Sequence, residues 1–199
     1  MKFRLIISFF YCVLTLSLAS CGFSGTTQNQ SEDVIEFRQV LSVASAQSTV
    51  EAYGQKFTDV DCQNPPTDFE APIDIVGCSS DEQEIYLLGA PELDGNLIKR
   101  AEPDRDSTAG DQWFIKIEFD DFGTKKFAEF TRRVTTLPAP MNQIAITSSN
   151  LVITAPRISE AILSGSAQIT GAFTMKEAIE LSKAIKNRSA IPSFVRWRE

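Results

Sequence analysis

The side chains that could carry chemistry are carboxylates and cysteines, because the 199-residue sequence contains no histidine. The chain therefore lacks the usual general base at neutral pH and the commonest zinc ligand. Paired-carboxylate hydrolysis needs two acids facing each other across a cleft. The adjacent acidic pairs at residues 120–121 and 32–33 are explained instead by a helix start and a polar segment. Residues 59–64, DVDCQN, lack the glycine and distant glutamate of a calcium loop. We assign no catalytic residue, metal site or cofactor, and we expect a protein that is not an enzyme.

The charge balance argues against nucleic acid as a partner. The chain has 19 Lys and Arg against 26 Asp and Glu, a net charge of −7. Binding to phosphates requires clustered cations, and no basic run of any length occurs. The hydrophobic content of 43% is normal for a globular protein, and the length suits one domain with or without a tail.

The amino terminus has the pattern of an export signal. In residues 1–20, Lys2 and Arg4 precede an apolar run of signal-peptide length. Residues 18–21, Leu-Ala-Ser-Cys, resemble the lipobox of bacterial lipoproteins. That resemblance implies cleavage before Cys21, acylation of Cys21 with fatty acids such as palmitate, and anchoring to the cell membrane outside the cytoplasm. The alternative is an ordinary signal peptide or signal anchor with an incidental cysteine.

The expected location outside the cytoplasm bears on the next segment and on the two remaining cysteines. Residues 21–33 are small and polar, which indicates a flexible tether. With Cys12 in the signal segment and Cys21 acylated, Cys62 and Cys78 would form one disulfide in an oxidising compartment. Its loop, residues 62–78, would contribute roughly 3 kcal/mol through chain entropy. A metal site is the alternative, and it fits two such distant cysteines poorly.

The rest of the chain, residues 34–199, is expected to form one domain with several strands. Residues 34–43 fit either a strand or a helix, and residues 191–197 are expected to form a final edge strand because of their proline. Short apolar runs or alternating patterns between turn residues predict the other strands at residues 85–88, 113–119, 144–147, 151–154 and 167–170.

Two helices are predicted from their capping residues. Asp120 or Asp121 can cap the first, and Thr174 can cap the second, with Glu177 completing a capping box. Together these elements predict an α+β fold, a two-layer sandwich in which a mostly antiparallel sheet carries two main helices on one face.

Several segments, in the same order, resemble SecD of the SecDF protein translocase. They are EFRQVLSV at residues 36–43, YLLGAPELDGNLIKRA at 86–101, FDDFGTKKFAEFT at 119–131, and the stretch from IAITSSNLVITAP to AQITGAFTMKEAIELSKAI at 144–185. The resemblance implies the first extracytoplasmic, head-bearing domain of SecD, an α+β structure thought to touch emerging, unfolded preprotein.

The departures from that family limit what is carried over. Its strand pair turns on Asp-Gly, whereas here the turn is Ser148-Ser149-Asn150. The translocase's membrane helices, which carry proton coupling, have no counterpart in this sequence, so proton-driven pulling is not implied. We expect a lipoprotein that binds unfolded polypeptide or an envelope protein partner, as an accessory to protein export. The alternative is a module for a small ligand or cell-wall component, or a structural spacer in an envelope complex.

Overall fold

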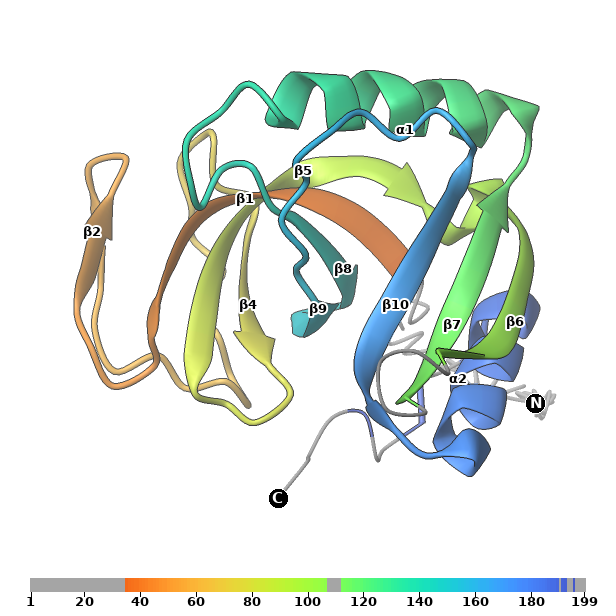
Figure 1. Ribbon diagram of the computed structural model, residues 1–199. Coiled ribbons are helices and arrows are strands. Elements are labelled where there is room, and N and C mark those ends of the chain that lie inside the picture. Colours follow the sequence, from red (N-terminus) through yellow and green to blue (C-terminus); the bar gives the residue numbers. More distant parts are fainter. Residues whose placement is uncertain (1–34, 107–111, 190, 193–194, 196–199) are drawn as a thin grey trace, which may run out of the picture. The chain divides into compact units, whose positions relative to one another are not determined.

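The computed structural model describes residues 35–106, 112–189, 191–192 and 195 (Figure 1). The predicted signal peptide and tether, residues 1–20 and 21–33, lie outside the described residues, and so does Cys21. Among the described residues, no helix is both long enough and apolar enough to cross a membrane.

Five strands form a closed barrel. Their order is β1 (Ile35–Ser45), β5 (Glu84–Asp94), β4 (Ile75–Ser79), β9 (Leu151–Thr154) and β8 (Ile144–Ser148), and β8 pairs back with β1. All pairs are antiparallel except β4 with β9. Because neighbouring side chains of a strand point to opposite faces, alternate residues fill the interior. The interior cluster draws on all five strands and includes Val40, Leu88, Ile75, Val152 and Ala145.

A separate sheet and two helices complete the domain. The sheet has the order β10 (Ser166–Phe173), β7 (Gln112–Phe119), β6 (Ile98–Asp106), and a short 3₁₀ turn, η1 (Gly95–Leu97), leads into β6. Helix α2 (Met175–Asn187) packs on β6, β7 and β10, while α1 (Asp121–Val134) contacts β5 of the barrel and β7. The largest core cluster joins the barrel, the sheet and both helices through Phe37, Ile115, Phe130, Ile169 and Leu181.

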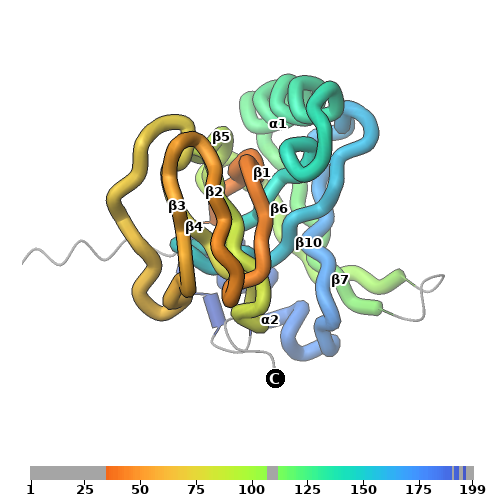
Figure 2. The backbone as a smooth tube through the Cα atoms, turned by 90° about the vertical axis from the view of Figure 1, so that its left-hand side faces the viewer, coloured from red at the N-terminus to blue at the C-terminus, as the bar shows by residue number. Residues whose placement is uncertain are grey.

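A small hairpin, β2 (Val50–Ala52) with β3 (Gln55–Phe57), lies beside the barrel, on the side away from the three-stranded sheet (Figures 1 and 2). Phe57 is buried and its ring lies 6.1 Å from that of Phe69. The hairpin therefore packs on the loop closed by the disulfide.

Both helices begin at the predicted residues. Asp120 is the cap of α1, and its Oδ1 accepts a hydrogen bond from the Gly123 N–H at 2.7 Å. Thr174 and Glu177 form the predicted capping box of α2, in which each side chain accepts from the other residue's backbone N–H. Such caps satisfy amide donors that the helix cannot satisfy itself.

The predicted α+β class, with two helices and mostly antiparallel sheets, is confirmed. The finer prediction of a single two-layer sandwich is not, because the strands divide between a barrel and a separate sheet. The division follows from β1, which bends through several register shifts while pairing with β5 and β8. The sequence pattern gives no direct sign of such distant pairing.

Two strand predictions are corrected. The strand predicted at residues 85–88 runs on through Gly89 and Pro91 to Asp94, because the register shifts opposite Pro91 accommodate a residue without an N–H. At the predicted final strand, the described residues Ile191, Pro192 and Val195 are not in a strand. The edges of the three-stranded sheet are β10 and β6 instead.

Candidate functional site

The two cysteines among the described residues are joined beside β4 and β9, the parallel strand pair of the barrel. Cys62 and Cys78 form a disulfide with their Cα atoms 5.8 Å apart. Cys78 lies in β4 opposite Leu151 of β9, and its N–H donates to the Asn150 carbonyl at 2.8 Å. The Asn150 side-chain amide donates in turn to the Cys62 carbonyl at 3.0 Å. The bridge thus fastens the loop of residues 62–78 to the only parallel pair of the barrel, which is a structural role.

Two acidic side chains of the loops, those of Asp61 and Asp81, accept hydrogen bonds within turns. Hydrogen bonds from the Asn64 side chain and the Gln63 N–H lower the pKa of Asp61. The Ser79 hydroxyl and the Gln83 N–H do the same for Asp81. Among the described residues, no three His, Cys, Asp or Glu side chains come together in a group that could hold a metal ion.

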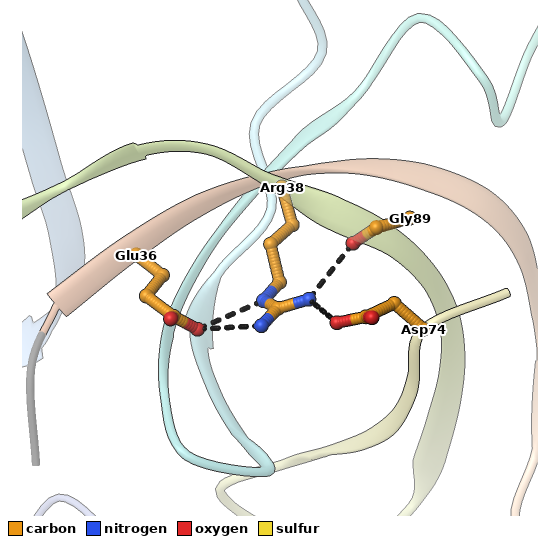
Figure 3. A network of polar contacts seen from close by, with 4 residues as sticks. All are labelled: Glu36, Arg38, Asp74 and Gly89. Atoms are coloured by element: carbon orange, nitrogen blue, oxygen red, sulfur yellow. Dashed lines mark hydrogen bonds and ion pairs between the residues drawn. The ribbon is translucent and has the colours of Figure 1, made fainter.

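One buried cation stands at the bend of β1. Arg38 is only 5% exposed, and its guanidinium meets three acceptors (Figure 3). It donates to Glu36 Oε2 at 2.8 and 2.9 Å, to Asp74 Oδ2 at 2.5 Å and to the Gly89 carbonyl at 2.9 Å. These contacts tie β1 to β5 and to the residue preceding β4, at the point where the β1–β5 register shifts. The fork geometry of arginine suits several acceptors at once, and every partner belongs to the scaffold.

Among the described residues, a groove of about 400 Å³ between the barrel and the three-stranded sheet is a candidate binding site. The buried side chains of Phe37, Phe127, Ile144 and Ile146 lie behind its lining. The apolar residues of the lining that remain partly accessible are Pro156, Ile162 and Ala167. The segment after β9 and the edge strand β10 also line it. We call it the β10 groove, and it is lined by Phe37, Lys116, Phe127, Ile144, Ile146, Pro156, Arg157, Ile158, Ile162, Ser164, Ser166, Ala167, Gln168 and Thr170.

Local contacts hold the walls of the β10 groove in place. The segment between β9 and β10 is fastened to α1, because the Ile162 N–H donates to the Thr131 hydroxyl at 3.0 Å. The Ile158 N–H donates to the Asn142 carbonyl at 2.8 Å, which fixes the same segment beside the start of β8. The charged residues that line the groove are Lys116 and Arg157, both cations. Lys116 is paired with Glu118 of the same strand at 3.4 Å, so the positive charge of the lining rests mainly on Arg157. The groove is therefore preformed and largely apolar, as expected of a binding cleft.

Sequence reasoning missed this groove. The interpretation of residues 144–147, 151–154 and 167–170 as strands was correct, but their apolar side chains were assigned to the core alone. Most of those side chains are indeed buried. The uncharged sequence of β10, SAQITGAF, was the available signal for an open edge, since edges that must stay unpaired usually carry charges or proline.

Comparisons with known proteins agree on one family. The family model for the SecDF P1 head subdomain matches residues 74–190. The protein translocase subunit SecD of Streptomyces coelicolor is 34% identical over 113 residues, covering 55% of this chain and 20% of the relative. SecD of Acidaminococcus fermentans is 34% identical over 127 residues, covering 59% and 29%.

A solved structure shows the same likeness. The crystal structure of SecDF in its super-membrane-facing form matches with a TM-score of 0.51 at 25% sequence identity, covering 81% of this chain and 19% of that chain. The chain thus spans less than a third of the length of each of these three relatives.

Proposed function

Because the chain belongs to the SecDF P1 head subdomain family, matched over residues 74–190, we propose that it binds unfolded polypeptide or an envelope protein without catalysis. Its role would be accessory to protein export. It works outside the cytoplasm, anchored to the cell membrane by lipid on Cys21. The tether of residues 21–33 gives the domain reach from the membrane.

The β10 groove is the observation that carries this proposal. Its apolar surface suits the side chains that an unfolded protein exposes. Its two lining cations, Lys116 and Arg157, favour segments that are neutral or acidic. No acidic residue lines the β10 groove.

Titration of the full chain, purified in mild detergent, with fluorescently labelled unfolded secretory proteins tests this function. We expect saturable binding that the folded forms of the same proteins do not show. No affinity up to high micromolar concentration, with circular dichroism showing a folded domain, would contradict it. Recovery of translocase subunits with the intact protein from solubilised membranes would favour the role in export.

The volume of the groove favours a second candidate. About 400 Å³ lies within the range of pockets that take small molecules, so a small ligand or a cell-wall component could occupy it. The fold would then serve as a ligand module or as a spacer in an envelope complex. Saturable binding of soluble cell-wall fragments, in competition with unfolded protein, would support this candidate.

A further inference from the structure

Among the described residues, no strand pairs with the edge of β10 that faces away from β7. We propose that this free edge accepts an extended polypeptide segment as an added strand, within the β10 groove. The inference rests on the proposed polypeptide binding and says how it occurs. Strand addition supplies affinity through backbone hydrogen bonds, while alternate side chains of the added segment meet the pocket. The structure supports it at three points: the direction of the β10 backbone, the contrast with the other edge, and the chemistry of the groove.

The backbone groups of β10 that face the groove can be assigned from its pairing with β7. The Phe119 N–H of β7 donates to the Gly165 carbonyl at 2.9 Å, and the register continues with Ala167 opposite Ile117 and Ile169 opposite Ile115. In an antiparallel pair, alternate residues exchange the hydrogen bonds. The bonds to β7 therefore belong to Ala167 and Ile169.

The backbone groups of Ser166 and Gln168, which alternate with Ala167 and Ile169, lie on the other side of the strand. By the same alternation, the N–H and C=O groups of Ser166 and Gln168 point away from β7, toward the free edge. Ser166, Gln168 and Thr170 all line the groove. The register shifts beyond Ile169, so the regular part of the edge suits an added strand of about five residues.

The opposite edge of the sheet is blocked against such pairing. Pro103 of β6 lies opposite Ile115, so its backbone faces outward, where it has no N–H to offer. The next outward N–H, that of Arg105, donates to Asp104 Oδ1 at 2.8 Å. The remaining protection is charge, and the charged residues of β6 are Lys99, Arg100, Glu102, Asp104, Arg105 and Asp106.

None of these devices protects β10. Its sequence, SAQITGAF, contains neither a charged residue nor a proline. An extended, uncharged edge normally invites association with another chain. The residues of this edge line a groove whose partly accessible apolar residues are Pro156, Ile162 and Ala167 and whose lining cations are Lys116 and Arg157. The segment that fits is therefore extended, with alternate apolar side chains, and neutral or acidic.

The test uses the full chain in mild detergent and a capped nine-residue peptide that alternates Val or Ile with Thr or Ser, with one Glu at each end. Gln168→Pro removes an N–H that points away from β7, so no hydrogen bond to β7 is lost. The native Pro103 occupies the equivalent kind of position on β6. We expect Gln168→Pro to weaken peptide binding about tenfold or more, whereas the matched Gln168→Thr, which keeps the N–H, binds as the unmodified chain does. Amide exchange at Ser166 and Gln168 should slow when the peptide binds.

A second measurement keeps the inference testable if Gln168→Pro fails to fold. In one peptide the odd-numbered residues are N-methylated, and in a second peptide the even-numbered residues are. Each peptide therefore has one edge whose N–H groups are blocked and one edge whose N–H groups are intact. Strand addition predicts that one of them loses binding about tenfold or more and the other does not. Equal binding by both, or equal binding by the two Gln168 variants, would overturn strand addition and leave polypeptide binding standing. No binding of this peptide or of unfolded proteins to the unmodified chain would overturn both.

Discussion

The buried Arg38 network allows a quantitative prediction. Replacing Arg38 with Met keeps most of the apolar stem and removes the contacts with Glu36, Asp74 and the Gly89 carbonyl. Removing one partner of a buried ion pair costs about 3–5 kcal/mol. The side chains of Glu36 and Asp74 are 25% and 45% exposed, so water can hydrate them again. We therefore expect a loss of about 3 kcal/mol in the free energy of unfolding, at the low end of that range.

Arg100 of β6 provides the matched control. Its guanidinium also meets two carboxylates, those of Glu102 and Glu118, but its side chain is 53% exposed. Exposed pairs of this kind contribute about 0–1 kcal/mol. Urea unfolding followed by circular dichroism would measure both variants, with the same dependence on urea concentration expected for each. If Arg38→Met costs no more than Arg100→Met, the stabilising role assigned to Arg38 is wrong.

Three further predictions concern single groups. Replacing Cys62 and Cys78 with Ser should lower the free energy of unfolding by roughly 3 kcal/mol, and reduction of the unmodified chain should reproduce that loss in urea unfolding. Burial, with a hydrogen bond to Glu84, raises the pKa of Tyr86, so the folded state favours the neutral phenol. The free energy of unfolding should therefore fall as the pH rises above about 10, the pKa of tyrosine in the unfolded chain. Tyr86→Phe should lessen that fall in thermal unfolding at alkaline pH. Cys21→Ser should abolish labelling by radioactive palmitate and release the protein from the membrane, while retained labelling would refute the anchor.

The local structure of the domain could be predicted from sequence because its signals are local. Asp120 and Thr174 cap the two helices through side chains that act within three residues. Residues 113–119, with their alternation of apolar and polar residues, became β7 with one residue added. The hairpin of β8 and β9 turns at the Ser-Ser-Asn segment, where Ser149 takes a positive φ of 53°. Each of these features depends on neighbours in the chain.

The closure of the barrel and the groove could not be predicted because they depend on distant pairing. Arg38 gave no sign of burial in the sequence, since one of its carboxylate partners, Asp74, lies 36 residues away. The strand or helix ambiguity of residues 34–43 was resolved by pairing with β5 and β8. The groove brings together residues from β1, β8, β10 and α1, and no single motif contains them.

Photo-crosslinking in the cells that produce the protein tests the central claim most directly. A benzoylphenylalanine residue placed at Gln168, on the free edge of β10, should crosslink to unfolded precursors of exported proteins. The same residue placed at Glu102, on the blocked edge of β6, provides the control and should give no such product. Absence of precursor crosslinks from Gln168, or equal yields from the two positions, would contradict polypeptide binding at the β10 groove.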